Sequence, residues 1–436
     1  MVTKGNTEIP PMYQWATDLF PIHRGLTGDG VRQTLGYIKE LLPNLAVHEV
    51  PSGTKAFDWT VPKEWVIREA YFHAPECEPI DIKQNNLHVV QYSAPFQGWI
   101  SWDELDAHLH SLPDQPLAIP YVTSYYKQQW GFCLTHRQRA AVRAHGDLFY
   151  VHIDSELKDG HLTYGELVIP GEKQTEVLLS TNICHPSMAN NELSGPVVVA
   201  ALAQWLASAP RRHTYRILFL PETIGALVWL SRHPEECART IAGYQVVCCG
   251  DERTYSYLPS RKGNTLADRA AIKALRGANI YHGANTPSFT LYSYLDRGSD
   301  ERQWCAPGID LPVGSIMRSK YDTYPEYHTS LDDLSFISQK GLEGSLAVYK
   351  RALEIIEANR TYKVTTLGEP QLGKRGLYPT ESTKDTFSKV ENVLNLLAYA
   401  DGTRDLIAIS DIIGVDVLSC ARTAEMLREH GLLEIA

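Results

Sequence analysis

The sequence predicts an α/β protein whose mostly parallel sheet is covered by helices on both faces. It also predicts an inserted small all-β domain and a C-terminal winged helix-turn-helix domain. Three observations lead to this architecture. Apolar runs alternate with helical patterns from about residue 130, and short aromatic and β-branched runs fill residues 52–125. Three short helical patterns then follow one another within residues 387–436.

The N-terminal part predicts two helices and then a β domain. PMYQWATDLF and GDGVRQTLGYIKELLP carry apolar residues at helical spacing, and the second helix is expected to begin at Asp29 or Gly30. FDWTVPKEWVIREAYF, NNLHVVQYSAPF and DQPLAIPYVTSYY are instead short strand-like runs cut by Pro, Asn and Gly. We therefore assign residues 52–125 to a β insert within an α/β domain made of residues 1–51 and 126–361.

The α/β domain is predicted from three buried strands. EVLLSTNIC (176–184), YRILFLP (215–221) and YQVVCCG (244–250) are almost wholly apolar, and the first two are followed by the helical patterns SGPVVVAALAQWLAS and ETIGALVWLSRHP. Strands buried on both faces and alternating with helices are typical of a parallel sheet. Ligands of such sheets collect beyond the carboxyl ends of the strands.

The C-terminal part begins with a segment rich in Gly, Pro, Thr and Lys, which predicts a linker over residues 362–386. The winged helix-turn-helix domain is expected over residues 387–436. Residues 367–436 contain seven basic and eleven acidic side chains. This excess of acid opposes DNA binding, so packing or assembly of a homo-oligomer is the expected role.

The composition indicates a globular protein without nucleic-acid or membrane partners. The 436 residues carry a formal net charge of −10, which offers no attraction to polyanions. The first twenty residues lack the apolar core of a signal peptide, and the longest apolar run is too short to span a bilayer. The eight cysteines show no disulfide or CxxC spacing, which favours reduced thiols and a cytoplasmic location.

Polar residues at the strand ends predict a functional site. His185, Glu222 and Asp251 each follow one of the three apolar strands, and His328 lies in the distant segment PEYHTSLDD. A hydrolytic zinc site needs imidazole and carboxylate ligands and a separate carboxylate that takes a proton from water. We expect these four side chains to surround one cavity.

These motifs resemble those of the zinc aminopeptidases with a phosphorylase/hydrolase-like α/β fold. The chain offers His185 followed by NELSG, then ETIG, GD, GSDERQ and YHTSLDD, in the order of that family. CHPSMAN, PETIG, SRKGNT, GSDERQ and PEYHTS are more closely similar to a bacterial aminopeptidase-like subfamily. That subfamily carries an inserted β domain and a C-terminal winged helix.

The resemblance implies a role for each motif residue. Glu222 would be the general base, and the metal ligands would be His185, Asn191, Asp251 and His328. Asn191 stands in the place of a bridging aspartate, and Thr223 in that of a second-metal carboxylate. Because both are neutral, we expect one zinc ion rather than two. The resemblance also implies substrate-binding side chains, which are Arg261, Asp300, Glu301, Arg302 and Tyr327.

Other interpretations of these residues stay open. Asn190 and Asn191 are good helix caps that need no metal, and Asp251 is also an ordinary turn residue. Glu192 is expected to point about 100° away from Asn191 on a regular helix. His185 is followed by Pro186 and not by the aspartate that often orients such a histidine, so its support is expected to be altered.

Together these observations predict a zinc-dependent amidohydrolase. Its expected substrate is a small aminoacyl, amide or peptide-like molecule, and the subfamily suggests a polysaccharide or specialised-metabolite pathway. A single-metal enzyme that transfers or cyclises amides is one alternative. A metal-poor pseudoenzyme that binds an aminoacyl ligand or a partner protein is the other.

Overall fold

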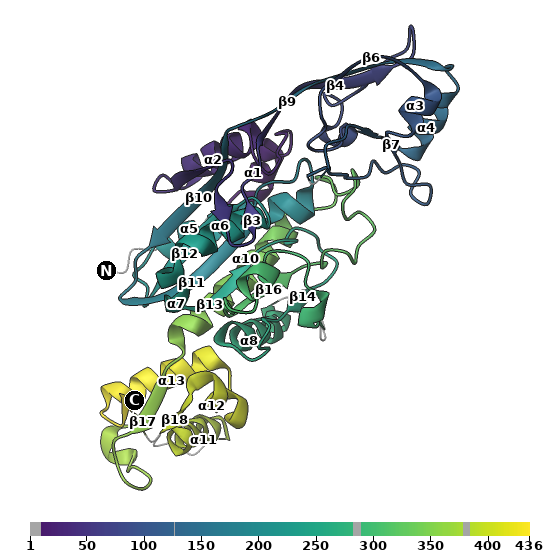
Figure 1. Ribbon diagram of the computed structural model, residues 1–436. Helices are drawn as coiled ribbons and strands as arrows, with labels where there is room; N and C mark the ends of the chain where they lie inside the picture. The colour runs from purple at the N-terminus through teal and green to yellow at the C-terminus, as the bar shows by residue number, and fades with distance from the viewer. Residues whose placement is uncertain (1–9, 126, 282–288, 378–383) are drawn as a thin grey trace. The chain divides into compact units, whose positions relative to one another are not determined.

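The computed structural model describes residues 10–125, 127–281, 289–377 and 384–436 (Figure 1). The chain divides into two compact units, Met1–Asp268 with Thr286–Ala347, and Arg269–Asn285 with Val348–Ala436. Over the described ranges, no helix has both the length and the apolar character needed to cross a membrane.

The first unit is built on an eight-stranded mixed sheet. Its strands, in spatial order, are β1 (Ala46–Pro51), β10 (His161–Ile169), β12 (His213–Leu220), β11 (Lys173–Asn182), β13 (Thr240–Gln245), β16 (Val313–Met317), β14 (Ser256–Leu258) and β15 (Thr290–Leu291). The central strands β12, β11, β13 and β16 are parallel. Strand β10 pairs antiparallel with β1 and β12, and β14 pairs antiparallel with β16 and parallel with β15. The predicted α/β class is confirmed, and the parallel region is the part that carries the predicted site.

Helices cover both faces of this sheet. They are α1 (Met12–Leu19), α2 (Asp29–Leu41), α5 (Ser194–Ala207), α6 (Ile224–Arg232), α7 (Pro234–Arg239) and α9 (Glu301–Trp304). Helices α8 (Leu266–Tyr281) and α10 (Gln339–Ala358) each have residues in both units. Val177 and Leu178 are neighbours on β11 whose side chains point to opposite faces, and both are buried. The helix predicted to begin at Asp29 or Gly30 begins at Asp29.

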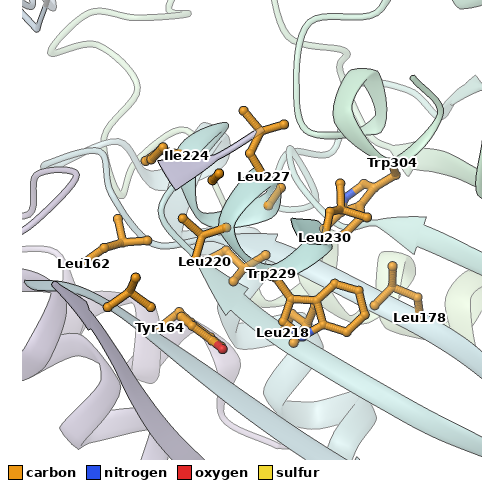
Figure 2. Close-up of a cluster of buried hydrophobic side chains, with 14 of the residues drawn as sticks. Leu162, Tyr164, Leu178, Leu218, Leu220, Ile224, Leu227, Trp229, Leu230 and Trp304 are labelled. Carbon is orange, nitrogen blue, oxygen red and sulfur yellow. The ribbon is translucent and has the colours of Figure 1, made fainter. Parts of the chain in front are cut away.

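The core beneath α6 holds α9 against the sheet (Figure 2). Leu218, Leu220 and Leu227 belong to one buried cluster with Trp229 and Trp304. The two indole rings meet edge to face at 5.9 Å, and Trp304 Nε1 donates to Gln245 Oε1 at 3.2 Å. Because Trp304 is the last residue of α9, this packing places residues 300–302 beside the N-terminus of α6.

The β insert has its own four-stranded antiparallel sheet, in the order β5 (Ile80–Asp81), β4 (Glu64–His73), β9 (Leu148–Lys158) and β6 (Phe96–Ser101). Ala70, Phe72, Phe149 and Val151 form part of its buried core. Strand β9 lies beyond the boundary predicted at residue 125 and pairs with β4 and β6, and the bounds of the β insert stay a prediction. The sequence DLFYVHIDS reads equally well as a strand of the following domain.

The C-terminal module has the winged helix-turn-helix arrangement that the sequence predicts. It contains β17 (Thr361–Val364), α11 (Lys384–Tyr399), β18 (Asp401–Asp405), α12 (Leu406–Ile413), α13 (Val417–Glu429) and β19 (Leu433–Ile435). Its sheet has the order β18–β17–β19. Strand β17 takes up residues at the start of the predicted linker 362–386, and residues 378–383 of that linker lie outside the described residues.

Candidate active site

His185 follows β11 and is oriented by a buried carboxylate. Oε1 of Glu192 accepts hydrogen bonds from the backbone N–H groups of Cys184 and His185, the latter at 2.8 Å. Oε2 lies 2.7 Å from Nδ1 of His185. Glu192 is only 1% exposed. Nε2 of His185 faces Glu222, whose Oε2 is 3.6 Å away.

Glu192 supplies a support for His185 that the sequence analysis did not assign to it. Residues Ala189–Leu193 form one π-helical turn ahead of α5, not the first turn of a regular α-helix. The wider turn changes where each side chain points, and Glu192 faces back to His185. The missing aspartate after His185 is thereby replaced by a carboxylate seven residues away.

Cys184 and Glu192 favour the protonated form of His185, so a metal ion at Nε2 would have to displace a proton. Burial disfavours the charged imidazolium, but Cys184 and Glu192 outweigh it and hold the pKa of His185 well above its ordinary value. Burial also raises the pKa of the Cys184 thiol to about 12, so that thiol is protonated at neutral pH. Glu192 is therefore the anion that increases the basicity of His185.

Glu222 follows β12 and lies near two other acidic side chains, Glu192 and Glu301. Burial raises its pKa. The backbone N–H of the next residue, Thr223, donates to Oδ1 of Asp300 at 2.7 Å, and Arg302 Nη2 donates to the Thr223 hydroxyl at 2.7 Å. Thr223 has φ = +64°, a costly backbone conformation for a β-branched residue. These contacts from the 300–302 segment hold the turn that presents Glu222.

His328 reaches the same place from the loop between β16 and α10. Its ring centroid lies 5.5 Å from that of His185, and the ring of Tyr327 stacks on it at 3.9 Å. Burial, and then the charge of His185, lower the pKa of His328 to about 3, so its imidazole is neutral at neutral pH. The structure therefore brings His185, Glu222 and His328 together, as the sequence predicts.

The β insert contributes a residue that the sequence analysis missed. The ring of Tyr121 packs edge-on against His185 at 5.1 Å and against His328 at 5.2 Å. Its backbone N–H donates to the carbonyl of His328 at 2.9 Å, and Ser330 N donates to the carbonyl of Ile119. Tyr121 sits in a run of tyrosines and β-branched residues, and nothing in that pattern distinguishes it from the other residues of a β domain.

Asp251 is surrounded by other partners. Its carboxylate accepts hydrogen bonds from Ser319 N at 2.8 Å, Ser319 Oγ at 2.9 Å and Arg253 N at 2.9 Å, and Asn190 Nδ2 lies 3.3 Å away. Oδ1 of Asn190 accepts in turn from Gly250 N at 2.8 Å. These bonds tie the loop after β13 to the start of α5. They give Asp251 a structural role, and a ligand role for it stays a prediction.

Asn191 lies beside a thiol. Its Oδ1 is 3.8 Å from Sγ of Cys248, and its backbone N–H donates to Asp332 at 2.9 Å. Asp332 also accepts from Asn190 N at 2.6 Å, and burial raises the pKa of Asp332 to about 7. The remote Asp332 therefore caps this helix start, so the interpretation of the two asparagines as the caps is wrong.

The predicted substrate-binding residues fall into two places. Asp300, Arg302 and Tyr327 lie at the site through their contacts with Thr223 and His328. Glu301 is fully buried, and one of its oxygens accepts from Gly298 N and Ser299 N. Arg261 instead pairs with Asp310 at 2.9 Å, an ion pair in which the Arg261 side chain is 42% exposed.

The side chains at this site have the chemistry of zinc ligands. Two imidazoles and a nearby carboxylate are typical zinc ligands, and Nε2 of His185 and the neutral His328 supply the imidazoles. Within the described part of the chain, one group of three or more His, Cys, Asp or Glu has ligand atoms all within 4.8 Å: Cys184, His185 and Glu192. Both oxygens of Glu192 already accept hydrogen bonds, so this group supports His185 and leaves Nε2 as the open position.

Comparisons with known proteins agree with this fold. Residues 13–359 match a family described as "Domain of unknown function (DUF4910)", and residues 360–435 match a winged helix-turn-helix family. The chain is 41% identical over 429 residues to a protein of Clostridium acetobutylicum named "Putative polysaccharide biosynthesis protein with aminopeptidase-like domain". The match covers 97% of this chain and 96% of that protein.

Solved structures show the same similarity. A crystal structure titled as a putative peptidase from Clostridium acetobutylicum aligns with a TM-score of 0.89 at 40% identity, over 98% of this chain and 96% of the other. A zinc aminopeptidase from Bacillus subtilis aligns with a TM-score of 0.57 at 13% identity, over 79% of this chain and 95% of that one. At that identity the second comparison shows the fold alone, and it confirms the resemblance to the zinc aminopeptidases.

Proposed function

The chain belongs to the family of the domain of unknown function DUF4910, with an aminopeptidase-like fold and a winged helix, and from this premise we propose that it is a zinc-dependent amidohydrolase. The proposed substrate is a small molecule with an aminoacyl or amide group. The name of the Clostridium acetobutylicum relative supports a place in polysaccharide biosynthesis.

One observation carries this proposal. The imidazole of His185 is fixed by Glu192 so that Nε2 faces the carboxylate of Glu222, with the neutral ring of His328 alongside. A histidine held through Nδ1 by a carboxylate is the usual arrangement of a metal-binding histidine. The half-buried carboxylate of Glu222 faces Nε2 and has a raised pKa, which suits a general base.

His185 and His328 would hold the zinc ion, which when bound supplies a Lewis acid and lowers the pKa of water. Glu222 takes a proton from the attacking water and passes it to the leaving amine. Arg302 and Asp300 hold the Thr223 turn, which keeps the Glu222 carboxylate in place. Tyr327 and Tyr121 flank the histidines and restrict the space for the substrate.

We propose one zinc ion per chain. Asn191 and Thr223 are neutral at the positions where two-metal relatives carry carboxylates, and the oxygens of Asp251 accept from Ser319 and Arg253. Two divalent ions at close range repel each other strongly unless anionic ligands lie between them. Asn191 lies next to the thiol of Cys248, and its backbone N–H donates to Asp332. These neighbours support a single ion.

Metal analysis of the purified full-length protein, followed by incubation with aminoacyl amides and anilides, tests this function. We expect about one equivalent of zinc and release of free amine with the carboxylic acid. Products in which the acyl group has moved to another amine, or has cyclised, would indicate the amide-transfer alternative. Failure to bind zinc after supplementation would make the protein a binding protein and would remove the hydrolase proposal.

Asn191→Asp is expected to tighten metal binding by about tenfold or more and to raise hydrolytic activity, because it restores an anionic ligand. Without metal, the new carboxylate is a buried charge beside the thiol of Cys248. The variant should therefore melt at a lower temperature in chelator and recover with zinc. Titration calorimetry and thermal melts measure both effects.

The matched control is Asn190→Asp, which places the same charge one residue earlier, next to Asp251. We expect that control to lose stability without any gain in zinc affinity. Equal zinc affinities for the wild type and Asn191→Asp would contradict the assignment of Asn191 to the bridging position.

Tyr121→Leu is expected to weaken zinc binding by about 10-fold to 100-fold, the usual effect of losing a residue that supports a metal ligand. The ring of Tyr121 packs against both imidazoles. Tyr121→Phe keeps that ring and loses only the hydroxyl contact with Tyr125 at 2.9 Å, so it should retain near-normal affinity. Competition with a chromophoric chelator measures both variants, and equal losses would assign the effect to the hydroxyl.

A further inference from the structure

The sheet of the β insert has an outer face that the proposed catalytic site does not use. Strands β4, β9 and β6 lie side by side (Figure 1), and their inward side chains, such as Phe72 and Val151, form the core. Side chains on a strand alternate between faces. The opposite face therefore carries six side chains that we call the aromatic face: Tyr71, His73, Gln97, Trp99, Tyr150 and His152.

These six side chains form two rows across the three strands. His73, Tyr150 and Trp99 are cross-strand neighbours, and so are Tyr71, His152 and Gln97. The ring of Trp99 lies 5.3 Å from that of Tyr150, and Tyr71 lies 5.1 Å from His152. Three strands at the usual spacing make the rows about 10 Å wide.

The aromatic face is open and offers hydrogen-bonding groups between its rings. Trp99 is 51% exposed, and the exposed Gln97 donates to the Tyr150 hydroxyl at 2.7 Å. Cross-strand aromatic pairs each contribute only about 0.2–1 kcal/mol to a sheet. A contiguous exposed group of this kind therefore indicates a binding surface more than a stability device.

The charges around the aromatic face determine which class of ligand it can bind. Arg68 pairs with Asp154 at 2.9 Å and with Glu156 at 3.0 Å, and Lys83 pairs with Glu69 at 3.0 Å. Two cations against three carboxylates leave the rim with one excess negative charge, in a chain of net charge −10. Charge complementarity therefore opposes a nucleic acid or an anionic lipid and favours an uncharged ligand.

We propose that the aromatic face binds a neutral oligosaccharide. The C–H face of a pyranose packs on an aromatic ring such as Trp99 or Tyr150, while its hydroxyls need donors and acceptors within reach. The exposed amide of Gln97 and the Tyr150 hydroxyl provide them. A width of about 10 Å accommodates about two sugar rings. This site stands apart from the amide chemistry, and neither proposal depends on the other.

The test uses the full-length protein on an array of neutral and acidic bacterial oligosaccharides, followed by calorimetry with the neutral glycan that binds best. We expect binding of at least one neutral glycan and a loss of at least tenfold in Trp99→Ala. Trp59→Ala removes another partly exposed tryptophan and serves as the matched control, with unchanged affinity expected. The amide-hydrolysis rate of Trp99→Ala on small substrates should equal that of the wild type.

Several outcomes would overturn the proposal. They are the binding of no glycan by the wild type, the binding of acidic glycans alone, and equal affinities for the wild type and Trp99→Ala. A dimer of the wild type that Trp99→Ala converts to a monomer, measured by light scattering, would assign the aromatic face to a second copy of the chain. Binding of single-stranded RNA that Trp99→Ala abolishes would assign it to nucleic acid.

Discussion

Glu222→Gln is expected to lower the rate of amide hydrolysis by about 10²-fold to 10⁴-fold, the usual contribution of a general base. Glutamine has the shape of the native side chain and cannot accept the proton. The variant should fold normally, because the change also removes a buried negative charge beside Asp300. Burial, and then the charge of Glu222, raise the pKa of Asp300 well above its ordinary value.

Two measurements make the result for Glu222 specific. Zinc content should stay near that of the wild type, and Glu156→Gln, an exposed carboxylate of the β insert, should have full activity. Loss of zinc together with activity would make Glu222 a metal ligand and would leave the base unassigned. Full activity in Glu222→Gln would remove it from the mechanism.

Glu192→Ala is expected to destabilise the fold by roughly 3 kcal/mol or more, because it leaves three buried hydrogen-bond donors without an acceptor. These donors are Cys184 N, His185 N and Nδ1 of His185. Each buried donor left without an acceptor costs about 1–3 kcal/mol. Urea denaturation should show a lower midpoint with an unchanged slope.

Zinc affinity distinguishes the role of Glu192 in orienting the His185 ring from its role in the stability of the fold. Freeing Nδ1 lets the His185 ring rotate, so zinc affinity should fall by about 10-fold to 100-fold. Glu192→Gln keeps the size of the side chain and one acceptor oxygen, so we expect it to recover part of the stability. Glu69→Ala, an exposed carboxylate, should change stability by less than about 0.5 kcal/mol. A Glu192→Ala protein as stable as the wild type would contradict the hydrogen bonds seen here.

The sequence predicts those parts of the site that depend on strand ends. The apolar runs before His185 and Glu222 are long enough to identify two parallel neighbours, and parallel strands bring their ends to one edge. The Tyr-His-Thr motif predicts His328 as a residue of the site. The helix–strand pattern and the winged helix were likewise predictable, since each element has a strong local period.

The other parts of the site depend on backbone conformations that leave no periodic pattern in the sequence. The apolar run through residue 250 reads as one strand, but β13 ends at Gln245. Cys248, with φ = +53°, then turns the chain. Cys248 therefore lies beside Asn191, and Asp251 reaches Ser319 instead. The π-helical turn that directs Glu192 arises in the same way, from tertiary contacts with Asp332 and not from helix propensity.

The pairing between the β insert and the His328 loop has a consequence for how the protein is made. Ile119 and Ser330 bond to each other across 211 positions of the chain. Contacts of such long range form late, because a large loop must close first. A nascent polypeptide that still lacks its last quarter contains His185 and Tyr121 but not His328, which contacts both of them. Metal capture should consequently wait until the loop around His328 has been synthesised, and translation products that end before this loop should carry no zinc.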